Sequence, residues 1–119
     1  MSASNLAKEM IDGAEAAYAN GELTFAEEQL LNALKLYDLS VVDKESILVR
    51  LAGLACQQGQ YLCGAHYYLL DLQSKSQRYD CEDPVMKQAS RNYRKLLELS
   101  LPNPDEIEND SEEKTIYCS

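Results

Sequence analysis

The sequence contains no long apolar run and nothing that would direct the chain across a membrane. No stretch of about 18 or more apolar residues occurs, so we expect no membrane-spanning helix. The first ten residues include Lys8 and Glu9 and lack the apolar segment that a secretory signal needs. We therefore predict a cytoplasmic protein that has no membrane partner.

Histidine and cysteine are scarce and poorly spaced for metal binding. His66 is the only histidine, and the four cysteines form no C-x-x-C pair. A zinc site would need an unusual assembly of distant ligands, so we expect no metal and no cofactor. Cys56 and Cys63 fit better as small apolar fillers between helices, and Cys118 as the accessible thiol.

Motifs that support catalysis are missing as well. The chain has no Gly-rich phosphate loop and no oxyanion motif. Cys63 and His66 lie three positions apart, so they could share a helical face and form a thiol-dependent active pair. No further catalytic signal accompanies them. We predict that the protein is not an enzyme and keep this pair as the catalytic alternative.

The negative charge is concentrated at one end of the chain. Of a net charge of −9 over 119 residues, the segment 102–119 contributes −5, because its six acidic residues face Lys114 alone. Two prolines and few apolar residues make this segment, by prediction, a disordered acidic tail. The remainder, residues 4–101, is long enough for one domain. A protein this acidic is a poor candidate for binding the phosphates of a nucleic acid, so we expect no nucleic-acid partner.

Apolar residues return every three or four positions along most of the chain, which is the period of an amphipathic helix. Gly21 and Gly59 each follow such a period and are expected to end a helix. Asp43 is the expected N-cap of the third helix, and Pro84 the first residue of the fifth. The expected helices span approximately residues 4–20, 23–37, 43–58, 61–72 and 84–101. The fold class is therefore all-α.

A pattern of large and small residues repeats at a spacing of 38 positions. Large residues match large ones, and small residues match small ones. A repeat of this length indicates stacked supersecondary units, which usually present a surface to a partner. The first set is Met10, Ala14, Ala17, Gly21, Leu23, Ala26, Leu30 and Leu34, and the second is Leu48, Ala52, Ala55, Gly59, Tyr61, Gly64, Tyr68 and Leu72.

The segments GELTFAEEQLLNALKLY (21–37) and AGLACQQGQYLCGAHYYLLDL (52–72) resemble the tetratricopeptide repeat. The resemblance implies antiparallel helix hairpins stacked as a short solenoid of about five helices. Ala14 with Ala26, and Ala52 with Gly64, would lie where two helices approach closely. Two departures stand out. The spacing exceeds the family's usual length of about 34 residues, and the closing proline is missing.

The family binds its ligands on the inner face, which the first helix of each hairpin lines. The resemblance therefore implies a protein- or peptide-binding adaptor or assembly subunit, or one segment of a longer array in a larger complex or a homo-oligomer. Ile11 and Glu15 occupy places where chaperone-binding members carry Lys and Asn, so that ligand is not expected. The candidate partner-binding residues are Lys8, Ile11, Glu15, Tyr18, Ser46, Val49, Arg50, Gly53 and Gln57.

The fifth expected helix carries a possible basic stripe of Lys87, Arg91, Arg94 and Lys95. Arg91 lies four positions after Lys87, and Arg94 and Lys95 lie three and four positions after Arg91, so the four side chains are expected to share one face of the helix. Such a run is most often a solvated face. The alternative is that the acidic segment 105–113 folds back onto the stripe and competes with an acidic partner.

Overall fold

The computed structural model describes residues 3–36 and 38–101. Within them the chain forms five α-helices and no strand, which confirms the all-α prediction. The helices are α1 (Ala3–Ala19), α2 (Leu23–Leu34), α3 (Val41–Gln57), α4 (Tyr61–Lys75) and α5 (Pro84–Ser100). None of these helices is long and apolar enough to cross a membrane. The segment 102–119, predicted as an acidic tail, and Cys118 lie outside the described residues.

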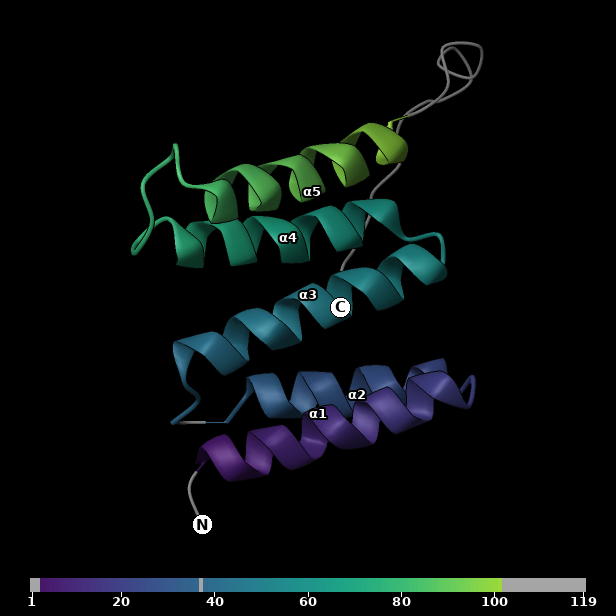
Figure 1. The fold of residues 1–119 in the computed structure, drawn as a ribbon. Coiled ribbons are helices and arrows are strands. Elements are labelled where there is room, and N and C mark those ends of the chain that lie inside the picture. The colour runs from purple at the N-terminus through teal and green to yellow at the C-terminus, as the bar shows by residue number, and fades with distance from the viewer. Residues whose placement is uncertain (1–2, 37, 102–119) are drawn as a thin grey trace.

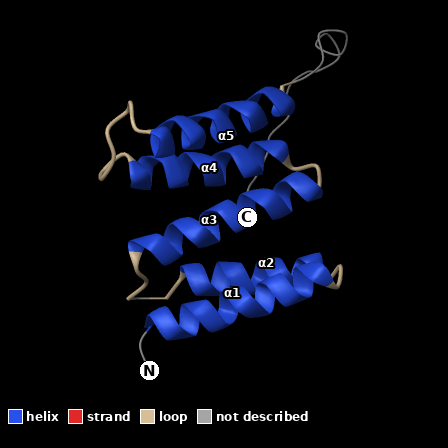
Figure 2. Cartoon of the chain, in the orientation of Figure 1, coloured by secondary structure: helices blue, strands red, loops and turns tan. Residues whose placement is uncertain are grey.

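The helices follow one another in a zigzag, each antiparallel to the one before it (Figure 1). α1 and α2 form a hairpin at one end, α3 lies in the middle, and α4 and α5 pack together at the other end (Figure 2). α3 contacts α2 and α1 as well as its own hairpin partner α4. The core therefore runs continuously from the first hairpin into the second.

The turn between the helices of each hairpin has the same geometry. Gly21 and Gly59 adopt left-handed φ values of 81° and 75°, which glycine accepts without steric strain. In the first turn the Glu22 amide donates to the Ala17 carbonyl at 2.8 Å, and the Gly21 amide donates to Tyr18. The second turn repeats this pair of bonds 38 positions later. Both are Schellman motifs, so the predicted role of the two glycines is confirmed.

The start of α3 differs from the prediction. Asp43 is not the N-cap, because its own amide donates to the side chain of Ser40 at 3.1 Å. Ser40 caps the helix, and α3 begins at Val41. Residues 35–40 therefore connect α2 to α3. The start of α5 is as expected, since Asp83 caps the amide of Val85 at 2.9 Å and Pro84 opens the helix.

Small residues allow the helices of the core to approach one another. Ala14 and Ala26 are almost fully buried in the first hairpin. In the second, a Cβ added to Gly64 would lie 2.7 Å from Leu96 and 3.2 Å from the carbonyl oxygen of Ala52. The expected close approach of Ala52 and Gly64 is confirmed, and α5 takes part in it. The largest apolar side chains that are fully buried are Leu30, Ile47, Leu48 and Leu51.

Candidate functional site

A cavity of about 530 Å³ opens between α1 and α3. Its lining is mostly apolar, and part of its floor comes from the second helices α2 and α4. An apolar hollow with a few polar groups is the usual form of a ligand site. The lining residues are Ala14, Glu15, Tyr18, Ala26, Leu30, Val49, Arg50, Gly53, Leu54 and Tyr68.

A second cavity of about 560 Å³ lies on the same face and continues the first toward α5. The two cavities share Tyr18, Gly53 and Tyr68, so they form one depression, here called the inner groove. The groove passes from α1 over α3 to α5, the first helices of successive pairs along the chain. Its α5 side is formed by Asn92, Lys95, Leu96 and Leu99.

Two polar contacts cross the inner groove from α1 to α3. Arg50 donates to Glu15 through Nε at 3.0 Å and through a second guanidinium nitrogen, and it also donates to Ser46. The Gln57 amide donates to the hydroxyl of Tyr18. Both contacts are largely exposed, and exposed ion pairs contribute roughly 0–1 kcal/mol to stability. A ligand can therefore displace these contacts at little cost and use the same groups.

Burial raises the pKa of Tyr68 above its ordinary value, and the nearby Cys56 and Asp71 act in the same direction. The phenol therefore stays protonated at neutral pH. Tyr68 belongs to the shared part of the inner groove, and a protonated phenol can donate a hydrogen bond. The sequence pattern marked Tyr68 only as a repeat residue, because a residue of a second helix was not expected on the binding face.

Most of the predicted partner-binding residues line the inner groove, and a few do not. Glu15, Tyr18, Val49, Arg50 and Gly53 line the inner groove, and Gln57 lines its part near α5. Ser46 lies beside the groove as a partner of Arg50, whereas Lys8 is exposed on α1 and lines no part of it.

Ile11 is the member of the set that the structure contradicts. It is 8% exposed and belongs to the hydrophobic core. Ile11 shares the helical register of the buried residues Ala7 and Ala14, so its side chain faces α2 and α3 rather than a partner.

The basic stripe is divided between two surfaces. Lys87, Arg91 and Arg94 line a cavity of about 640 Å³ next to the carboxyl-terminal end of α4, here called the basic cavity. Lys95 instead lines the inner groove. α5 packs against α4 along its length (Figure 1), and no residue lines both hollows.

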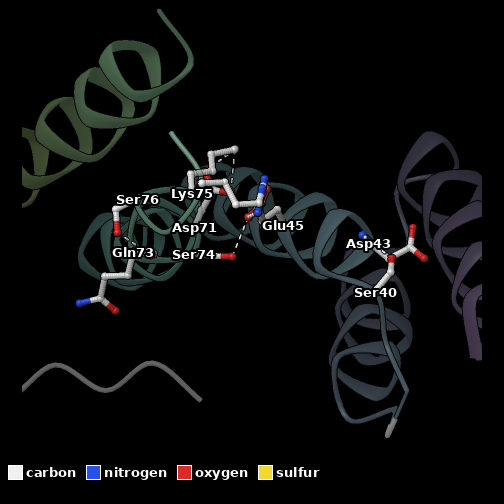
Figure 3. A network of polar contacts seen from close by, with 9 residues as sticks. Ser40, Asp43, Glu45, Asp71, Gln73, Ser74, Lys75 and Ser76 are labelled. Atoms are coloured by element: carbon white, nitrogen blue, oxygen red, sulfur yellow. Dashed lines mark hydrogen bonds and ion pairs between the residues drawn. The ribbon is translucent and has the colours of Figure 1, made fainter. Parts of the chain in front are cut away.

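A polar network that the sequence did not predict ties α3 to the end of α4 and the loop after it (Figure 3). Glu45 is 6% exposed and accepts two hydrogen bonds from Arg78, at 2.7 and 2.9 Å, and one from Ser74. Asp71 is 1% exposed and accepts both of its hydrogen bonds from Lys75. Two buried carboxylates thus each have a cationic partner, as burial of charge requires.

The two carboxylates of this network have opposite pKa shifts. The hydrogen bonds from Arg78 are the main cause that holds the pKa of Glu45 below its ordinary value. Burial raises the pKa of Asp71, although Lys75 opposes the shift. Ser74 and Arg78 also line a cavity of about 560 Å³, but no buried side-chain polar atom among the described residues lacks a hydrogen-bond partner, so we assign the network a structural role.

The alternative catalytic pair is poorly placed. Cys63 is buried at 4% exposure and is not one of the free thiols, which are Cys56 and Cys81 among the described residues. His66 is exposed and packs its ring near that of Tyr67. A nucleophilic thiol must be free and reachable. In the part of the chain that the structure describes, no group of three His, Cys, Asp or Glu side chains is close enough to hold a metal ion.

Comparison with known proteins gave no match: no family model, no curated protein and no solved structure matches the chain. The inner groove and the basic cavity are therefore the features from which a function can be inferred. The first is mainly apolar, and the second carries three cationic side chains.

Proposed function

We propose that this protein is a non-enzymatic adaptor that binds a peptide segment of another protein in the inner groove. The observation that carries the proposal is the continuous hollow over α1, α3 and α5, with apolar walls and polar groups at its edges. Its position on the first helix of each hairpin agrees with the tetratricopeptide-like arrangement that the sequence resembles. The proposal keeps the short-solenoid interpretation of the fold and gives the protein no catalytic role.

Gly53 lies at the centre of the proposed site. Both parts of the inner groove include it, and a Cβ added there meets no atom within 4 Å. The missing side chain leaves room for an apolar side chain of a ligand between Tyr18, Val49 and Tyr68. A few large anchors in such pockets usually supply most of the binding energy.

Polar groups around this point suit the backbone of an extended peptide. Gln57, Arg50 and Tyr68 carry hydrogen-bond donors at the groove, and Asn92 adds both a donor and an acceptor on α5. Backbone groups of a bound peptide need such partners once water is excluded. We therefore expect a ligand with an apolar anchor and an extended backbone rather than a highly charged one.

The decisive experiment selects peptides from a random displayed library on the wild-type chain and compares their affinity for two glycine variants. Gly53→Leu fills the inner groove, whereas Gly13→Leu places the same side chain on α1 outside it, also with no atom near the new Cβ. We expect Gly53→Leu to weaken binding at least about tenfold, or ~1.4 kcal/mol, and Gly13→Leu to change it by about twofold or less.

Both variants should keep the wild-type helical content and melting temperature, because neither new side chain enters the core and leucine favours helix over glycine. Selected peptides that bind both variants equally would contradict the proposal. A selection that enriches no peptide on the wild-type chain would contradict it as well.

A second candidate function, that of an assembly subunit, is favoured by apolar side chains exposed away from the inner groove. Val42 is 71% exposed beside Val41 at the start of α3, and Leu101 is 63% exposed after α5. If these residues join the chain to copies of itself, its mass in solution should exceed that of one chain, and Val42→Lys should reduce it. A monomer at all concentrations would leave only assembly with a different protein.

A further inference from the structure

The basic cavity differs from the inner groove in its charge. It lies between the carboxyl-terminal part of α4 and the first three turns of α5. Lys87, Arg91 and Arg94 all line it, and Ser76 and Ser90 add hydroxyl groups. Three cations around one hollow form a site suited to carboxylates, because guanidinium groups bind them with charge-assisted hydrogen bonds.

These cations are poorly neutralised by the rest of the fold. Lys87 lies 3.3 Å from Glu82, with both side chains more than half exposed. Arg91 donates to the neutral amide of Gln88 at 2.9 Å. Within the described ranges, neither Arg91 nor Arg94 forms an ion pair. An accumulation of unpaired positive charge is notable in a chain whose net charge is −9.

We propose that the basic cavity is the docking site of a carboxylate-rich extended segment, and that its occupant is the acidic segment Asp105–Glu113 of the same chain. That segment holds six acidic residues and no basic one. Its charge is therefore complementary to that of the cavity. The inference does not depend on the function proposed for the inner groove, since no residue belongs to both surfaces.

The length of the chain fits this occupant. Along α5, Lys87 precedes Leu101 by about 21 Å at 1.5 Å per residue. An extended segment advances by about 3.3 Å per residue, so Asp105 can lie opposite Arg94 and residues 108–110 can reach Lys87. Docking would require the chain to reverse its direction after Leu101, where Pro102 and Pro104 follow in the sequence. The covalent link gives the segment an effective concentration in the millimolar range, which favours it over an acidic segment of another molecule.

Docking of this segment would regulate access to the basic cavity. An acidic partner peptide would have to displace it, so the apparent affinity for such a partner would be lower in the intact chain. The contact would also depend on salt, because at about 1 M ionic strength the screening length falls to roughly 3 Å.

A carbodiimide, which links a lysine amine to a carboxylate only when the two are in direct contact, tests the proposal on the full chain. Lys95 is the matched control: it is nearer to the acidic segment along the chain than Lys87, yet it faces the inner groove. We expect cross-links from residues 105–113 to Lys87 to exceed those to Lys95 by about threefold or more at low salt, and the excess to disappear at high salt. Peptide mapping by mass spectrometry of the monomeric product gives both yields.

The variant Arg91→Gln/Arg94→Gln provides the second measurement. Both side chains are exposed, so the fold should persist, which circular dichroism can verify. We expect the Lys87 cross-links to residues 105–113 to fall at least about threefold, while the Lys87 link to Glu82 continues to form. Equal yields at Lys87 and Lys95, a preference for Lys95, or no response to the double substitution would each overturn the proposal. Cross-links found mainly between two chains would overturn it in favour of a second copy as the source.

Discussion

The two hairpins have the same turn geometry, but at one end of the helix pair they bury side chains of different chemistry. The 38-residue register aligns Ala7 with Glu45 and Ala33 with Asp71. All four positions are buried, with Ala7 and Ala33 at 0%, Glu45 at 6% and Asp71 at 1% exposure. Small apolar side chains thus pack in α1–α2 at the positions where α3–α4 buries two carboxylates, each paired with a more exposed cation.

This difference shows that a repeated fold does not require a repeated interaction. Two alanines need no partners, whereas each buried carboxylate requires a cation and good hydrogen-bond geometry. In return, the network fixes the loop after α4, because Arg78 reaches back from it to Glu45 on α3. The second hairpin therefore positions the loop that leads to α5, and the first hairpin has no such connection at Ala7.

The largest effect is expected from breaking a charged pair of the second hairpin. Lys75→Met leaves Asp71 buried without its cation, which should lower the free energy of unfolding by about 3 kcal/mol. The double variant Asp71→Ala/Lys75→Met places at position 71 the alanine found at Ala33 and removes both charges, so it should lie within about 1 kcal/mol of the wild type. Urea denaturation at neutral pH measures both. A single variant as stable as the double one would show that Asp71 does not depend on Lys75.

A smaller loss is expected where the two hairpins differ in helix spacing. Gly64 aligns with Ala26, so Gly64→Ala makes the second hairpin identical to the first at this position. The new methyl group would crowd Leu96 and the Ala52 carbonyl, which should cost about 1–3 kcal/mol. Gly53→Ala is the control in open space and should be neutral or slightly stabilising. Equal stability of the two variants by thermal unfolding would contradict the close approach.

The pH dependence of stability should give the smallest effects, and it should come from the second hairpin. The pKa of Glu45 is lowered in the fold, so its contribution is present above its ordinary value near 4.5 and is lost as the pH falls through the lowered value. The pKa of Asp71 is raised, so its protonation favours the fold, and that contribution is lost as the pH rises through the raised value.

Substitution separates the two contributions. Glu45→Gln should make the protein less sensitive to acid than the wild type, and Asp71→Asn should make it more sensitive. Urea midpoints at pH 7 and pH 3.5 provide the comparison. The same sign of change for both variants would contradict the opposite pKa shifts.

Local sequence signals predicted the helices and both glycine turns, because periodicity, caps and left-handed glycines depend on neighbours in the chain. The predicted start of α3 was wrong. Ser40 and Asp43 are both acceptable N-caps, and only the folded backbone shows that Ser40 is the one used. The network around Glu45 was missed for a different reason. Its main partner, Arg78, is 33 positions away in a loop, and no period relates the two.

The candidate binding surfaces were likewise predicted only in part, because local sequence signals do not fix how the helices pack. The resemblance to the tetratricopeptide repeat implied that Glu15, Tyr18, Val49 and Arg50 share one face, and the structure brings them together at the inner groove. Ile11 was misplaced, because the edge of the core depends on how α1 tilts against α2 and α3. The basic stripe was predicted as one surface, but the structure divides it between two hollows for a related reason. Its four residues are neighbours on α5, and the packing of α5 against α4 determines which hollow each residue lines.

The identical turns at Gly21 and Gly59 make the length of this protein adjustable. A duplicate of residues 22–59 inserted after Gly59 would meet, at both of its junctions, the same residue types that already follow each glycine. The left-handed glycine would set the direction in which each added helix leaves its turn. The stack would therefore gain one helix pair without needing a new type of turn. The chain thus carries the connector for its own extension, and the inner groove could be lengthened in units of one hairpin.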